Sequence, residues 1–96
     1  MSENKEEQIA IYGTPLDVSM FMISAFRYAL GRQTYIVSST VNMLVKNIHA
    51  LNERDKVLIQ EEITEAKARG MISSYDKEQW DYLYDKVDES LLERKQ

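Results

Sequence analysis

Apolar residues in the middle of the chain recur at steps that fit one side of an α-helix. They follow a 4-3-4-3 rhythm at Val37, Val41, Leu44, Ile48 and Leu51. Residues 34–41 also have strand propensity, because β-branched residues are frequent there. The helical period continues through the whole segment and outweighs this local preference, so we predict a helix at about residues 33–50.

The preceding helix is marked by residues that favour its start and its end. Thr14 has a hydroxyl that can cap a helix, and Pro15 suits the first helical position. Gly31 is typical of the position just after a helix, so we predict this helix at about residues 15–30. Apolar residues cover most of its circumference, which is typical of a helix buried in a core or in an oligomer interface.

A third helix is predicted at about residues 53–69. Asn52 can cap its start, with an acid at the third position after the cap, and Gly70 can end it. The apolar residues that it is expected to present are Val57, Ile59, Ile63 and Ala66.

The last helix is expected at about residues 75–93, where Trp80 begins an apolar series at helical spacing and the acids fall largely on the other side. Short turns between the segments indicate an all-α fold, a small antiparallel helical hairpin or bundle of about four helices. Residues 1–12 are expected to be a flexible N-terminal tail or arm, and residues 13–96 to form a single helical domain.

Size and composition narrow the function classes. A domain of 96 residues without cysteine has no disulfide to stabilise it, and small domains of this kind often oligomerise, so we expect a homo-oligomer. The polar, acidic start does not resemble a signal peptide, and no apolar stretch is long enough to span a membrane, which indicates a cytoplasmic protein. A net charge of −4 argues against binding to extended nucleic acid.

Basic residues stand apart from the acids in one part of the chain. Between Val18 and Asn52 there is no carboxylate, although the chain has 16 acids. Arginine matches phosphate oxygens with its planar donors, and tyrosine offers a face for stacking and a hydroxyl. The candidate ligand-binding residues in this window are Arg27, Tyr28, Arg32 and Tyr35.

Two interpretations of these arginines remain open. They bind an anionic ligand, or they pair with carboxylates of the helix at 53–69, for which Glu61, Glu62 and Glu65 are the candidates. Lys46 and His49 share a helical face and either extend a basic groove or are solvated.

No residue pattern indicates an enzyme. The hydroxyl residues at 38–40 have no nucleophile motif around them, and hydroxyls in helices usually pack or bond back to the backbone. One histidine and no cysteine exclude a Cys/His metal site, and the acids of the last helix lack a calcium-loop spacing. We therefore expect neither catalysis, nor a metal, nor a cofactor.

The block at residues 26–38, FRYALGRQTYIVS, resembles a recurrent signature of small phage-encoded proteins. Residues 52–63 and the Tyr75-Asp76…Trp80 ending are similar to the same group, and the resemblance spans roughly residues 10–85. A weaker analogy, of size, helicity and the Arg/Tyr cluster, links the chain to phage helical-hairpin sponges that sequester nucleotide signals of CBASS and Thoeris immunity.

The resemblance implies a phage-encoded protein, and the weaker analogy to the sponges implies a non-enzymatic counter-defence protein that acts in the host cytoplasm. In this hypothesis a homo-oligomer sequesters a small phosphorylated nucleotide, with Arg27 and Arg32 on phosphate and Tyr28 and Tyr35 stacking or hydrogen-bonding. The alternative is a phage inhibitor or adaptor that binds a host protein through its aromatic and acidic C-terminal helix, which carries Trp80 and Tyr82.

Overall fold

The computed structural model describes residues 14–95, and all regular secondary structure in that range is helical. The all-α prediction is therefore confirmed, whereas the predicted tail or arm at residues 1–12 lies outside the described residues. The elements, in chain order, are α2 (Pro15–Ala29), α3 (Thr34–Lys46), the short 3₁₀ helix η1 (Ile48–Ala50), α4 (Glu53–Ala68) and α5 (Lys77–Lys95).

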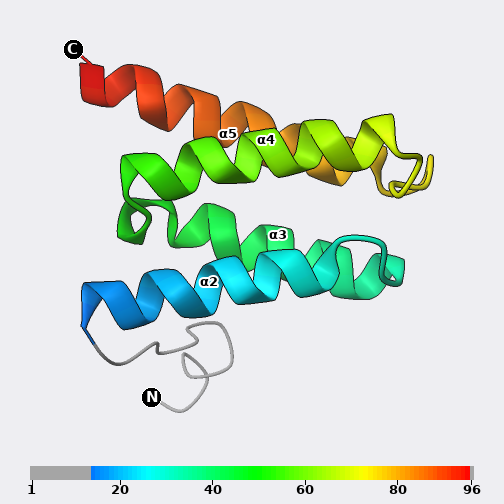
Figure 1. The fold of residues 1–96 in the computed structure, drawn as a ribbon, viewed down its shortest axis with the longest axis horizontal. Helices are drawn as coiled ribbons and strands as arrows, with labels where there is room; N and C mark the ends of the chain where they lie inside the picture. Colours follow the sequence, from blue (N-terminus) through cyan, green and yellow to red (C-terminus); the bar gives the residue numbers. More distant parts are fainter. Residues whose placement is uncertain (1–13, 96) are drawn as a thin grey trace, which may run out of the picture.

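The helices form two antiparallel hairpins that pack side by side (Figure 1). Helix α2 turns back into α3, and α4 turns back into α5. Across the hairpins, α3 packs against α5 and α2 packs against α4. This arrangement is the predicted helical bundle with antiparallel neighbours in sequence.

Two helix starts follow the predicted capping chemistry. The Thr14 hydroxyl accepts a hydrogen bond of 3.2 Å from the backbone N–H of Asp17, and the Asp17 carboxylate accepts one from the N–H of Thr14, which closes a capping box. Asn52 accepts a hydrogen bond of 2.8 Å from the N–H of Asp55 at the start of α4. These side chains satisfy backbone donors that a helix leaves free at its start.

Two glycines end helices in a conformation that other residues rarely adopt. Gly31 follows α2 with a φ of 78°, and Gly70 follows α4 with a φ of 72°. After α4, the N–H of Met71 bonds to the carbonyl of Ala66 at 2.9 Å and the N–H of Gly70 to that of Lys67 at 3.0 Å. This is a Schellman ending, which needs a left-handed residue at the glycine position.

Alanine at either glycine is expected to lower the free energy of unfolding by about 1 kcal/mol, because a Cβ disfavours positive φ. Space does not add to this cost: a Cβ on Gly31 would lie 3.8 Å from the terminal methyl of Met71, and one on Gly70 would meet nothing within 4 Å. Urea unfolding of Gly31→Ala and Gly70→Ala measures the effect, with Ser39→Ala on the exposed face of α3 as the control. Unchanged stability in both glycine variants would contradict the assignment.

The segment with mixed signals, residues 34–41, is helical. Val37, Val41 and Leu44 are fully buried, so the helical period determines the structure and the strand propensity does not. The predicted helix does not run unbroken to residue 50, however. The α-helix ends at Lys46, and Asn47 leaves helical geometry while its side-chain amide donates to the carbonyl of Met43 at 2.8 Å.

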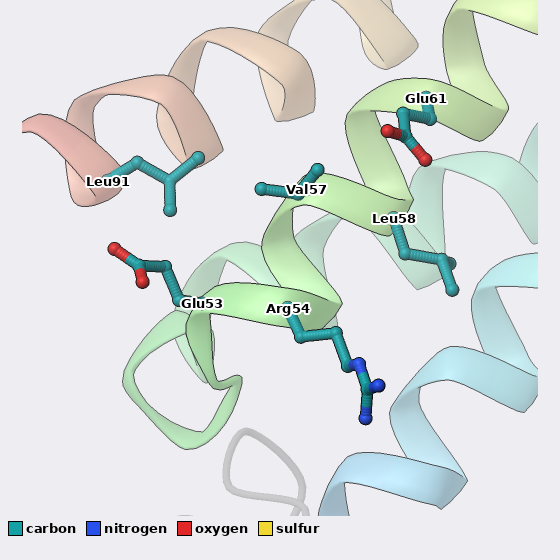
Figure 2. Close-up of a pocket in the computed structure, with 6 residues that line it drawn as sticks. All are labelled: Glu53, Arg54, Val57, Leu58, Glu61 and Leu91. Carbon is teal, nitrogen blue, oxygen red and sulfur yellow. The ribbon is translucent and has the colours of Figure 1, made fainter.

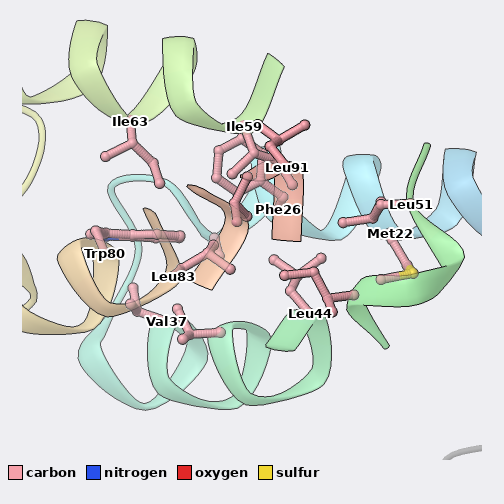
Figure 3. Close-up of a cluster of buried hydrophobic side chains, with 14 residues drawn as sticks. Met22, Phe26, Val37, Leu44, Leu51, Ile59, Ile63, Trp80, Leu83 and Leu91 are labelled. Carbon is pink, nitrogen blue, oxygen red and sulfur yellow. The ribbon is translucent and has the colours of Figure 1, made fainter. Parts of the chain in front are cut away.

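The core lies between all four helices, and Trp80 is its largest fully buried side chain among the described residues. The indole is fully buried and meets the buried ring of Phe26 edge to face, with ring centroids 5.7 Å apart. Figure 3 shows these side chains with the others that fill the bundle. The further fully buried residues of this cluster include Met22 of α2, Val37 and Leu44 of α3, Ile59 and Ile63 of α4, and Leu83 of α5.

Polar contacts connect the helices where the core meets the surface. Lys56 is only 2% exposed, and its ammonium group donates to the hydroxyl of Ser90 at 2.6 Å. Lys67 of α4 pairs with Asp81 of α5. The hydrogen bond from Lys67 lowers the pKa of the Asp81 carboxyl. The α4–α5 hairpin is thus held by packing and by these cross-helix polar contacts.

Candidate anion-binding site

Three of the four candidate residues meet at the turn between α2 and α3. Tyr28 lies in the last turn of α2, Arg32 in the connection, and Tyr35 in the first turn of α3. Both tyrosine side chains are open to solvent, with Tyr28 57% and Tyr35 69% exposed. The three residues line a surface depression of about 530 Å³ together with Gly31, Gln33 and Ile36.

Among the described residues, Tyr28 holds the side chain of Arg32 in place. Its Nε–H donates to the backbone carbonyl of Tyr28 at 3.0 Å, and its guanidinium carbon lies 4.5 Å from the centre of the Tyr28 ring. Such stacking on an aromatic ring stabilises the cation by about 0.5–1 kcal/mol at exposed sites. No ion pair of Arg32 forms with any carboxylate among residues 14–95. The terminal amino groups therefore carry a fixed, uncompensated charge suited to an anion.

The start of α3 adds to the positive potential of this depression. Gln33 occupies the capping position without a side-chain hydrogen bond, and the first turn of α3 contains no acid. By contrast, α2 and α4 each begin with a capping side chain and at least one acid in the first turn. Because the N-terminal end of a helix dipole is positive, the field of α3 acts in the same direction as Arg32.

Arg27 is engaged elsewhere. Its guanidinium pairs with Glu62 of α4, with Nη2 and Oε2 2.9 Å apart, and it is not among the residues that line the depression. The hydrogen bond and charge of Glu62 raise the pKa of Arg27 further. Both side chains are partly exposed, so the pair is expected to contribute only about 0–1 kcal/mol of stability. The sequence left open whether the two arginines bind an anion or pair with carboxylates of α4. Arg27 pairs with a carboxylate, whereas Arg32 does not pair with any in the described range.

A second hollow, of about 600 Å³, lies between the start of α4 and the end of α5. Figure 2 shows the residues that line it, which are Glu53, Arg54, Val57, Leu58, Glu61 and Leu91. The sequence analysis missed this hollow, because it grouped Val57 with the core-facing residues of α4. Val57 is instead 40% exposed. The sequence does contain a signal for this exposure. Val57, beside Leu58, does not lie on the helical face that carries the buried Ile59 and Ile63.

The remaining candidates lie away from both hollows. Lys46 and His49 are exposed at the opposite end of α3 from the Arg32 turn. Within residues 14–95, no group of three or more His, Cys, Asp or Glu side chains is placed to hold a metal ion. None of the described helices combines the length and the apolar character that crossing a membrane requires.

Comparison with known proteins does not extend this description. No family model, no curated protein and no solved structure matches the chain. The functional argument therefore depends on the geometry of the turn and of the hollows.

Proposed function

We propose that the chain is a non-enzymatic binding protein that sequesters a small phosphorylated nucleotide at the α2–α3 turn. The observation that carries the proposal is the placement of Arg32, fixed against Tyr28 and without a carboxylate partner in the described part of the chain. In this role Arg32 binds phosphate oxygens with its terminal amino groups. The exposed ring of Tyr35 offers a stacking surface for a base on the other side of the depression.

The proposal includes a homo-oligomer formed through α2. Met20 and Phe21 are 60% and 52% exposed, although large apolar side chains on a small domain are usually covered. Tyr28 follows Phe21 by two helical turns and so lies on the same side of α2. A second copy on this side would lie next to the depression, and the ligand would then be held between protomers.

The setting of the proposal is phage counter-defence in the host cytoplasm, as the resemblance of residues 26–38 to small phage proteins implies. Sequestration needs no catalytic group, because a bound signal is removed simply by mass action. The ligand is proposed to be small. One available arginine can neutralise about one phosphate, whereas tracking an extended backbone requires many such contacts.

A thermal-shift panel of mono-, di- and cyclic nucleotides is expected to raise the melting temperature with at least one small nucleotide and with no DNA. At a concentration of about 100 times Kd, a ligand adds roughly 2.7 kcal/mol to the free energy of unfolding. The shift should depend only weakly on salt, because few phosphates are contacted. Duplex and single-stranded DNA serve as the controls.

Native mass spectrometry of protein purified from infected cells then identifies what is bound. The expected spectrum shows a multiple of the 11.2 kDa chain with an added mass of nucleotide size. Stabilisation by DNA but by no nucleotide would overturn the proposal. A panel without any response, together with a spectrum free of small ligands, would favour the alternative of a host-protein inhibitor or adaptor.

A further inference from the structure

A continuous groove runs along the outer side of the second hairpin. The hollow shown in Figure 2 and a neighbouring one along α4 share Val57 and Glu61. Together they extend from the first turn of α4 to Ala68 near its end, a distance of about 20 Å at the rise of an α-helix. We call this surface the α4–α5 groove. Its lining includes Glu53, Arg54, Val57, Leu58, Glu61, Thr64, Ala68, Tyr84 and Leu91.

The floor of the groove is apolar and partly open to solvent. Val57 is 40% exposed at its centre, and Leu91 of α5, which is 9% exposed, faces it from the other helix (Figure 2). Leu58 and Tyr84 are half-buried along the same surface. A strip of this kind, about four helical turns long, matches the apolar side of one docked helix.

The edge of the groove is acidic. Glu53 and Glu61 form no ion pair with any side chain that the structure describes. Arg54 lines the same hollow as these two acids, and Figure 2 shows its side chain directed towards α2, away from Leu91. Residues 53–96 contain 12 acids and 8 bases and thus account for the whole net charge of −4. Glu53 and Glu61 outnumber Arg54 along the hollow of Figure 2, so the edge of the groove carries net negative charge beside an apolar floor.

We propose that the α4–α5 groove docks a basic amphipathic helix of a partner protein. The partner's apolar residues, at helical spacing, would cover Val57 and Leu91, and its Lys or Arg residues would face Glu53 and Glu61. Two copies of this chain do not suit one another here, because like charges would meet across the interface. The groove lies on the α4–α5 hairpin, so this proposal does not depend on nucleotide binding at the α2–α3 turn.

The probe is a synthetic amphipathic helical peptide of leucine and lysine, added to the full-length protein. Isothermal titration calorimetry should show binding that weakens with salt. Amide chemical-shift changes should concentrate at Val57, Glu61, Thr64 and Leu91. The same peptide with glutamate in place of every lysine should not bind, because its charges would meet those of the groove. A lysine peptide that does not bind, or that shifts mainly residues of α2 and α3, would overturn the proposal.

Two substitutions separate a specific groove from general attraction to an acidic protein. Glu61→Lys and Val57→Ser are each expected to weaken binding by about tenfold, which corresponds to roughly 1.4 kcal/mol. Glu89→Lys is the matched control, because it makes the same charge change on α5 but lines a different hollow, beside Val45 and His49. Equal losses in the two lysine variants would show that bulk charge alone attracts the peptide.

Native mass spectrometry of the same variants tests whether a second copy of the chain, and not a partner protein, covers the groove. The proposal requires that Val57→Ser and Glu61→Lys leave the oligomeric mass of the protein unchanged. A change of that mass would show that the groove is covered by a second copy of the chain, and would overturn the assignment to a partner protein.

Discussion

Replacing Trp80 with alanine is expected to lower the free energy of unfolding by about 3–5 kcal/mol. The indole is fully buried and contacts the ring of Phe26 edge to face, so its removal leaves a cavity in the core that the four helices enclose. A domain of this size has a total stability of roughly 5–15 kcal/mol, and the variant would therefore lose a large part of it. Urea unfolding followed by circular dichroism measures the difference.

Tyr75→Ala is the control for this experiment. Tyr75 precedes the same helix but is 84% exposed, and its truncation is expected to change stability by no more than about 0.5 kcal/mol. Similar losses for the two variants would contradict the burial of Trp80 in the core.

Arg32→Gln is expected to weaken nucleotide binding by about tenfold to a hundredfold, as for the loss of a charge-assisted hydrogen bond worth roughly 1.5–3 kcal/mol. Its melting temperature should remain nearly unchanged, because Arg32 is exposed and its side chain, within the part of the chain that the structure describes, bonds and stacks only with Tyr28. Calorimetric titration with the nucleotide found in the thermal-shift panel measures the first effect, and thermal unfolding of the free protein measures the second.

Arg27→Gln provides the matched comparison, since it makes the same change five residues earlier. It removes the pair with Glu62 and is expected to lower the stability by no more than about 1 kcal/mol, with little effect on binding. If Arg27→Gln weakens binding more than Arg32→Gln does, the ligand lies on the α4 side of α2, and the proposed site is misplaced.

Features decided by neighbouring residues could be predicted from the sequence. Thr14 and Asn52 cap the helices that follow them, because each side chain reaches a backbone N–H only three residues away. Gly31 and Gly70 end helices because the required φ depends on the residue itself. The period of the apolar residues from Val37 onward then determines which face of α3 is buried.

Features decided by distant contacts could not be predicted. Arg27 and Glu62 are 35 residues apart, and their pairing depends on how α2 packs on α4. From sequence alone, Glu61, Glu62 and Glu65 are equally suitable partners for Arg27, and only the packing of α2 on α4 selects Glu62. The hollow beside Val57 has the same origin, because it depends on where α5 crosses α4. The α4–α5 groove combines residues as far apart as Glu53 and Leu91, so no local pattern reveals it.

The contact between Phe26 and Trp80 also has a consequence for the growing chain on the ribosome. Phe26 belongs to the first described helix and Trp80 to the last, so the first hairpin is made well before the side chain that completes its core. The first hairpin is complete at Lys46, and at about 5–20 residues per second the synthesis of residues 47–80 takes roughly 2–7 s. During this interval the apolar faces of α2 and α3 have no α5 to cover them, so the nascent chain exposes these faces before its core can close.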